Sequence, residues 1–249
     1  MSFLDGVTHD NSMDTEKDVA RSFGPMASDI YDLTISMAYQ IESAGGAIGI
    51  VLDTKVAGGK SFKETFYITT KKKETKDKNG NALPGFLLVE SLCLLTAGEG
   101  IFTVAEKTET KLVNVYDSTQ SKEVPKEVPV LLPLIGKKIK AGLIHRIENK
   151  QAKNATSGAY EDVPGKIRES NTVNKFFHTE TKLTVAEIYA KKTEPLWHDK
   201  WLEDNKGAVE DRSSKTAAGA SSGKQSTAFA GASADASTEA PKSLFAGSN

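Results

Sequence analysis

The sequence contains few of the residues that build covalent or metal sites. Among 249 residues there is a single cysteine, Cys93, and the four histidines are far apart in the chain (His9, His145, His178 and His198). One cysteine cannot form a disulfide within the chain, and these residues match no recognised zinc spacing. Cys93 stands in an apolar run, where a small buried hydrophobic side chain is expected. We therefore expect no metal or other cofactor, and a reducing compartment such as the cytoplasm.

Long hydrophobic runs are also missing. No apolar stretch approaches the roughly 20 residues that a membrane-spanning helix needs. The first residues, Met1–Asp5, lack the basic region and the apolar core of a signal peptide. The chain is expected to be soluble and intracellular, without a membrane partner.

Recognisable catalytic motifs are absent as well. Gly59-Lys60-Ser61 resembles the end of a phosphate-binding loop, but Thr54 stands where that motif needs its first glycine. The acidic pairs Glu161-Asp162 and Glu210-Asp211 have no histidine or nucleophile nearby in sequence, and no Gly-x-Ser-x-Gly elbow occurs. We expect a protein that is not an enzyme.

Charge is nearly balanced overall but is segregated along the chain. The formal net charge is -1, yet residues 1–32 hold seven acidic and two basic side chains. Residues 55–78 hold eight lysines and three acidic residues, and residues 137–153 hold six basic residues and one acidic. Two basic segments in an acidic protein suggest an anionic ligand, although solvated protein faces remain the alternative.

Lysines and aromatic residues are interleaved between Lys60 and Lys73. A single-stranded nucleic acid needs cations for its phosphates and flat rings for its bases, and this segment supplies both. The alternative is an ordinary hairpin with a solvated lysine loop. Alternation places Phe62 and Phe66 on one strand face and Lys63 and Tyr67 on the other, and we expect the first pair to point inward.

The hydrophobic pattern predicts a mainly β fold with helical additions. Alternation over residues 31–42 and 47–56, joined by the turn Ser43-Ala44-Gly45-Gly46, predicts a hairpin, and residues 61–70 predict a third strand. A buried helix is expected at 86–96, ending near Gly98. Further strands are expected at residues 111–117, 128–135 and 138–149. This order is that of a five-stranded oligonucleotide-binding (OB) barrel, although other small barrels are not excluded.

Four regions are expected along the chain. Residues 1–27 form an acidic flexible arm, 28–155 the OB core, 156–212 a helical extension packed on the core, and 213–249 a disordered tail. In the extension, Thr184 and Glu187 fit a capping box, and Trp197 and Trp201 are expected to pack onto the core. The tail ends in an apolar pair, Leu244 and Phe245, which suggests a docking peptide, with accidental placement as the alternative.

Several short motifs together resemble bacteriophage single-stranded DNA-binding replication proteins. The resemblance spans roughly residues 28–210 and rests on Tyr31-Asp32-Leu33, the 43–46 hairpin, Phe66-Tyr67-Ile68-Thr69, Asn79-Gly80, Leu83-Pro84-Gly85-Phe86 and Gly136-Lys137-Lys138. It implies an OB barrel that coats single-stranded DNA during replication and recombination in the cytoplasm of the phage host.

The resemblance also implies which residues touch DNA. The strand would cross one basic face made of Lys60, Phe62, Lys63, Phe66, Tyr67, Lys71, Lys72 and Lys73. An opposing wall would be made of Lys137, Lys138, Lys140, Arg146 and Lys150. Members of this family commonly recruit replication or recombination proteins through an acidic C-terminal tail, but residues 213–249 here carry a formal charge of +1. The acidic N-terminal arm is therefore the better candidate for competing with DNA.

Two alternatives to DNA binding stay open. A virion structural or scaffold protein would have a β domain and a tail but no DNA affinity. A nuclease or recombinase accessory enzyme would need a carboxylate cluster for divalent metal, and the sequence does not reveal one.

Overall fold

The structure is a computed structural model that describes residues 24–117, 120, 122–153 and 160–213. Most of the expected arm and tail, including Leu244 and Phe245, lies outside this part of the chain. The elements in chain order are β1 (Asp29–Glu42), β2 (Ile48–Val56), β3 (Ser61–Tyr67), α1 (Pro84–Ala97), α2 (Ile101–Glu106), β4 (Thr108–Asp117), β5 (Lys122–Leu131), a 3-10 turn η1 (Leu132–Leu134), β6 (Lys138–Lys153), β7 (Tyr160–Phe177), α3 (Val185–Tyr189), α4 (Leu196–Asn205) and β8 (Val209–Asp211). None of the helices in these residues has the length and apolarity that crossing a membrane requires.

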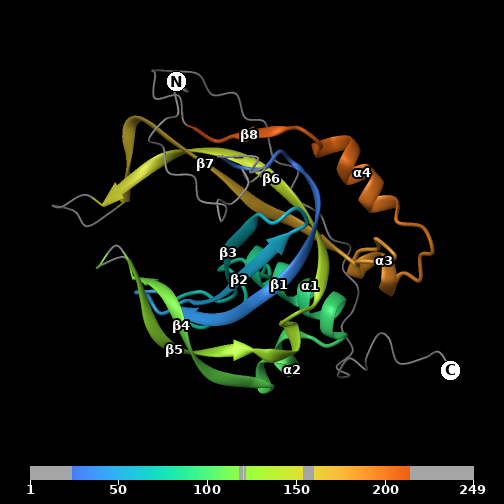
Figure 1. Cartoon of the computed structure of the whole chain (residues 1–249), viewed down its shortest axis with the longest axis horizontal. Coiled ribbons are helices and arrows are strands. Elements are labelled where there is room, and N and C mark those ends of the chain that lie inside the picture. Colours follow the sequence, from blue (N-terminus) through green and yellow to red (C-terminus); the bar gives the residue numbers. More distant parts are fainter. Residues whose placement is uncertain (1–23, 118–119, 121, 154–159, 214–249) are drawn as a thin grey trace, which may run out of the picture.

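The strands form one sheet with β1 at its centre, as Figure 1 shows. One edge of β1 pairs with β2 through the expected 43–46 hairpin. Its other edge is shared, because residues 29–34 pair with β6 while Tyr39 pairs with Val130 of β5. All pairings are antiparallel except that of β8, which runs parallel to β6. The prediction of a mainly β fold with helical additions is confirmed.

A bulge in β1 changes which residues share a face. The register with β2 shifts between Ile35 and Met37, so the alternation does not continue through the strand as the sequence suggested. Leu33 and Ile35 point into the main core, whereas Met37 and Tyr39 belong to a second apolar cluster on the other face, against β5. The sheet therefore buries apolar side chains on both faces.

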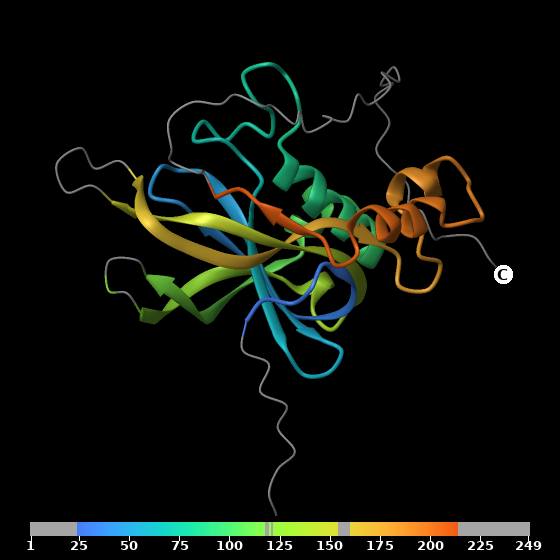
Figure 2. The ribbon, with the colours of Figure 1, turned by 90° about the horizontal axis from the view of Figure 1, so that it is seen from above.

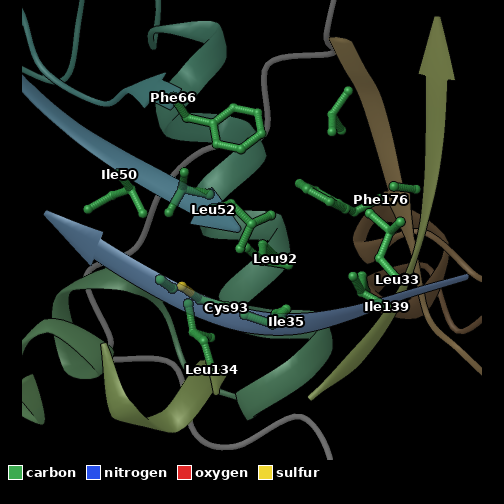
Figure 3. Close-up of a cluster of buried hydrophobic side chains, with 14 of the residues drawn as sticks. Leu33, Ile35, Ile50, Leu52, Phe66, Leu92, Cys93, Leu134, Ile139 and Phe176 are labelled. Carbon is green, nitrogen blue, oxygen red and sulfur yellow. The ribbon is translucent and has the colours of Figure 1, made fainter. Parts of the chain in front are cut away.

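Helix α1 covers the main core. Its apolar side chains, among them Leu92 and Cys93, lie in one cluster with Leu52, Ile35 and Phe66 from the sheet, as Figure 3 shows. The helix has a proline in its first turn and ends at Gly98, whose φ of 72° suits glycine. Helix and terminator were both expected from the sequence.

Residues 160–177 are a strand, which corrects the expectation of a helical extension throughout residues 156–212. Strand β7 pairs with β6 from Lys153↔Tyr160 to Lys140↔Phe177. Pro164 and Gly165 lie in an irregular segment of this ladder, between the pairs Asn149↔Ile167 and Gln151↔Asp162. Pairing with β6 continues on both sides of this Pro-Gly break, so the sheet extends beyond residue 155, where the core was expected to end.

The sheet is open between β3 and β7. Among the described residues, β3 pairs with β2 alone and β7 with β6 alone, so the expected five-stranded OB barrel is not confirmed. A side chain bridges these two edges: Glu64 of β3 accepts hydrogen bonds from the Val173 N–H at 2.8 Å and the Thr172 hydroxyl at 2.6 Å. The Phe66 and Phe176 rings meet edge to face beside it, with centres 6.2 Å apart.

The two C-terminal helices pack as predicted. Thr184 and Glu187 form the complete capping box of α3. Trp201 of α4 is buried, donates from its indole N–H to Asn174 at 2.8 Å, and packs with Ile144. It lies directly over Gly142, where a Cβ atom would come within 2.7 Å of the indole.

Candidate nucleic-acid interface

Strand β3 separates its aromatic residues between two environments. Phe62 and Phe66 are 6% and 4% exposed and belong to the main core, so neither ring is available to stack on a base. Lys63 and Tyr67 are exposed on the opposite face. The predicted inward and outward split is therefore confirmed, and the two phenylalanines drop out of the candidate contact set because their place is in the core.

Lys63 lies close to a ring and to carboxylates. Its Nζ is 6.0 Å from the centre of the Tyr39 ring and 3.5 Å from Glu123 Oε1. Burial by itself lowers the pKa of Lys63, but Tyr39, Glu123 and Asp53 outweigh it and raise the pKa above its ordinary value. Lys63 is thus a fixed positive charge on the outer face of β3.

Lys60 lies beside the point where the described chain begins. A small hollow of about 360 Å³ is lined by Lys60, Lys63 and the segment around Gly24 and Met26. The described part of the chain therefore begins next to two lysines of the candidate surface.

The segment between β3 and α1, which we call the lysine loop (residues 70–83), is shaped by short-range hydrogen bonds. Asp77 accepts from the backbone N–H groups of Asn79 and Asn81 at 2.8 and 2.9 Å, and these bonds, with that of Asn81 the largest, hold the pKa of Asp77 below its usual value. Thr70 likewise accepts from the N–H of Glu74. These turns leave the lysine side chains on the surface.

The lysine loop encloses a hollow of about 1070 Å³ that also contains an aromatic ring, and we call it the loop hollow. Phe102 of α2 lines it, is 69% exposed, and has its ring centre 6.0 Å from that of Phe86. The charged lining consists of five lysines and two acidic residues (Lys71, Lys72, Lys73, Lys76, Lys78, Glu74 and Asp77). Sequence reasoning missed Phe102, because a phenylalanine in a short helix reads as a core residue until its exposure is known.

A second hollow, of about 850 Å³, carries three tyrosines, and we call it the tyrosine groove. Tyr67 from β3, Tyr116 from β4 and Tyr160 from β7 line it and are 48%, 61% and 65% exposed. In Figures 1 and 2 the β4–β5 and β6–β7 hairpins extend to the same side of the molecule, opposite to α3 and α4. Tyr116 and Tyr160 were missed, because only tertiary structure brings these strand ends to Tyr67.

The tyrosine groove supplies rings more than cations. Its charged lining is Lys126 with Glu42, Asp117 and Glu127. Cations reach its rim from the lysine loop, where Lys73 Nζ lies 2.9 Å from Glu42 Oε1. Lys71 packs against Gly45, which lies in the wall of the groove and has no room for a Cβ atom without a shift of that lysine. The loop hollow and the tyrosine groove therefore adjoin at the 43–46 turn.

The second basic run does not form one wall. Lys138 and Lys140 lie beside the first half of β1, where Lys140 is 2.6 Å from Asp32, while the tyrosine groove lies at the end of β1. Arg146 is held by Glu210 at 2.8 Å and by Glu148 at 3.7 Å. The exposed Lys137 precedes β6 at the same end as Lys138.

Lys150 is the member of this run that lies near the tyrosine groove. It lines a hollow of about 540 Å³ together with Arg168 and Arg212, and this hollow shares Tyr160 with the groove. The groove thus has lysines beyond each end, the lysine loop on one side and Lys150 on the other, where Arg168 is paired with Glu148 at 2.9 Å and Arg212 with Glu210 at 2.6 Å.

Metal-ion chemistry has no visible site in this region. Within residues 24–117, 120, 122–153 and 160–213, no three histidine, cysteine or acidic side chains are grouped to hold a metal ion. Cys93 is buried, and burial, with a smaller contribution from Glu90, raises the pKa of its thiol well above the usual range. The described surface offers rings, cations and hydrogen-bonding groups.

Comparison with known proteins adds no relative. No protein-family model matches the sequence, and no curated protein matches it.

Proposed function

We propose that the protein binds single-stranded DNA independently of sequence and protects intermediates of replication and recombination, in a bacteriophage as the sequence motifs suggest. One observation carries this proposal: an exposed aromatic ring, Phe102, stands in a hollow lined by five lysines, and this hollow adjoins a groove with three exposed tyrosines. Rings accept unpaired bases whatever their sequence, and lysines neutralise the phosphates between them.

The strand order supports an OB-type barrel as the scaffold. Strands β3, β2, β1, β6 and β7 follow one another across the sheet, with α1 inserted after the third strand of the chain. An OB barrel has this order and places its helix at this point. On this proposal Glu64 takes the place of the missing main-chain ladder between β3 and β7, and the β4–β5 hairpin is an addition to the barrel.

The proposed path of the strand runs through both hollows. Bases would stack on Tyr160, Tyr116 and Tyr67 in the tyrosine groove, and on Phe102 in the loop hollow. Phosphates would lie against the lysine loop and Lys150, away from the carboxylates of the groove floor. Each base–aromatic contact contributes about 1 to 3 kcal/mol by truncation. Single-stranded DNA is the preferred form because paired bases leave no ring face free for stacking.

Partner proteins remain part of the proposal. Replication or recombination proteins would be recruited through Leu244 and Phe245, which lie outside the described residues. The alternative function, a virion structural or scaffold protein, predicts the same fold without affinity for oligonucleotides.

Aromatic truncation tests the proposal. Binding of fluorescent oligo-dT to wild type, Phe102→Ala and Tyr116→Ala is measured by anisotropy, with Tyr189→Ala as the control. Tyr189 is 54% exposed but lies in α3, at the opposite end of the molecule. We expect each of the first two changes to weaken binding about 5- to 150-fold, corresponding to about 1 to 3 kcal/mol, with little change in the control. Equal affinities in all four proteins would contradict the proposed path, and no binding by wild type would favour the scaffold alternative.

A further inference from the structure

Strand β4 has an unpaired edge. It spans Thr108–Asp117 and pairs along its whole length with β5, but with no other strand among the residues that the structure describes. In Figure 1 it lies at the lower rim of the sheet. An edge strand of this length exposes a row of N–H and C=O groups to which another strand can pair, and proteins protect such edges with charged side chains, prolines or bulges. The charges of β4 are Glu109, Lys111 and Asp117. Strand β4 contains no proline, and its register with β5 is uninterrupted.

The exposed side chains of β4 are large and apolar. Leu112 is 70% exposed and Tyr116 is 61% exposed, and both lie on the same strand face because they are four residues apart. Tyr116 lines the tyrosine groove, whereas Leu112 is not part of it. Leu112 is therefore a large apolar side chain that the described fold leaves mostly exposed.

Two prolines of β5 show which groups of β4 face this edge. Pro129 stands opposite Thr110, and Pro125 stands opposite Asn114. Because proline has no N–H, the hydrogen-bonded pairs of this ladder are the alternate ones, such as Lys111↔Val128. An N–H group at position 129 would face β1. Because Pro129 lacks this group, it cannot donate to β1, which agrees with a β1–β5 pairing limited to Tyr39↔Val130. The outward-facing main-chain groups are then those of Thr110, Leu112, Asn114 and Tyr116.

We propose that β4 pairs with β4 of a second copy of this chain, antiparallel about a two-fold axis at Asn114. In this register Leu112 stands opposite Tyr116 of the second copy, and both use outward-facing N–H and C=O groups. Val113 meets Val115 of the second copy on the other face. Lys111 meets Asp117 of the second copy, so opposite charges are paired at both ends. Each contact occurs twice, as a two-fold interface requires.

Charge selects this register over its neighbours. An axis at Lys111 places that lysine opposite itself, and an axis at Val113 places Glu109 opposite Asp117. Like charges directly opposite each other destabilise a strand pair, whereas opposite charges and aromatic–aliphatic pairs stabilise it. An axis at Leu112 would set Lys111 and Glu109 opposite valines. An axis at Thr110 would also match opposite charges, Glu109 with Lys111, but it pairs only residues 108–112 of the strand, whereas the axis at Asn114 pairs residues 111–117.

This interface shares Tyr116 with the tyrosine groove, and it is tested without DNA so that its outcome is separate from that of the proposed function. It would extend the eight-stranded sheet across two chains and place two grooves in one particle. A single pair of strands makes a small contact, so the association is expected to be weak and concentration-dependent.

Disulfide trapping tests the axis directly. In a hydrogen-bonded antiparallel pair the facing Cα atoms are about 5.5 Å apart, which lies within the range of a disulfide. In Asn114→Cys, two thiols of a dimer would give two electrons and two protons to oxidised glutathione and form an intermolecular disulfide. Thr110→Cys is the matched control, because its two copies would be about 27 Å apart, eight residues along the strand. The wild-type protein, whose Cys93 is buried, shows the background level of cross-linking.

The expected result is a band of doubled mass on a non-reducing gel for Asn114→Cys and little of it for Thr110→Cys. Comparable cross-linking of the two variants, or none of either, would overturn the proposal. All samples are freed of nucleic acid first, so that bound DNA does not bring two chains together.

A proline variant supplies a test that uses no cysteine. Asn114→Pro removes the central outward-facing N–H of β4. The ladder between β4 and β5 should remain, because Asn114 stands opposite Pro125 and its N–H takes no part in that ladder. Sedimentation velocity over a protein concentration series should show reversible association of the wild type and loss of it in Asn114→Pro, with melting temperatures alike. A wild type that stays monomeric at all concentrations, or a proline variant that associates equally, would contradict the proposal.

Discussion

Glu64 is the side chain whose removal most directly tests how the sheet is held together. Within the part of the chain that the structure describes, Glu64 links β3 to β7. Its carboxylate accepts hydrogen bonds from the Val173 N–H and the Thr172 hydroxyl. Glu64→Ala leaves the buried Val173 N–H without its acceptor, which costs about 1 to 3 kcal/mol. Part of this loss is offset, because the variant no longer buries a carboxylate. We expect a net loss of about 2 kcal/mol, which lowers Tm by about 4 to 8 °C in a chain of this size.

The assay is thermal or urea unfolding followed by circular dichroism, with two comparisons. Glu64→Gln keeps a carbonyl oxygen for the Val173 N–H and should lose less stability than Glu64→Ala. Glu123→Ala removes an exposed ion pair with Lys63 and should change stability by less than about 0.5 kcal/mol. Unfolding of Glu64→Ala at the wild-type temperature would refute the idea that this carboxylate holds β3 against β7.

The pH dependence of Glu64 has a definite sign. Burial raises the pKa of Glu64 above its ordinary value, and the bonds from Thr172 and Val173 and the charge of Arg146 only partly oppose this. The folded protein therefore holds this proton more tightly than the unfolded chain does. The contribution of Glu64 to stability is fully present at low pH and falls as pH rises from the ordinary value to the raised one. The unfolding free energy of wild type minus that of Glu64→Gln should decrease over this interval, and an increase would contradict the assignment.

Three further outcomes are expected. Gly142→Ala should destabilise the fold by more than about 1 kcal/mol, because its Cβ would lie 2.7 Å from the Trp201 ring, and chemical denaturation with Trp fluorescence checks this. Tyr67→Ala should weaken oligo-dT binding more than it lowers Tm, and Phe66→Ala should do the reverse, because the first ring is 48% exposed and the second 4%; equal effects of the two changes on Tm would argue against this division. Cys93 should stay unreactive toward a thiol reagent until the protein unfolds, because it is fully buried with a raised pKa, and rapid labelling of the native protein would contradict its place in the core.

Local patterns predicted those parts of the fold that local physics determines. The 43–46 hairpin, α1 with its Gly98 terminator and the capping box of Thr184 all depend on residues close together in sequence. The errors came from long-range pairing. The bulge after Ile35 and the continuation of β7 past Pro164 are set by the partner strand, which no local pattern contains.

The candidate surface was predicted in part for the same reason. Alternation correctly separated Tyr67 from Phe66, and the lysine loop is exposed as expected. Tyr116 and Tyr160 are distant from Tyr67 in sequence and meet it only through the two long hairpins. The second basic run looked continuous in sequence, but strand geometry distributes its residues among ion pairs and separate hollows.

The most direct test of the central claim is the affinity of the full-length protein for oligo-dT as a function of salt concentration, with a duplex of the same length alongside. The protein should prefer the single strand and, with about five phosphates neutralised, should show a slope of log affinity against log salt of about -3.5, from about -0.7 per phosphate. An affinity that does not change with salt, equal affinity for the duplex, or no binding at all would contradict the claim.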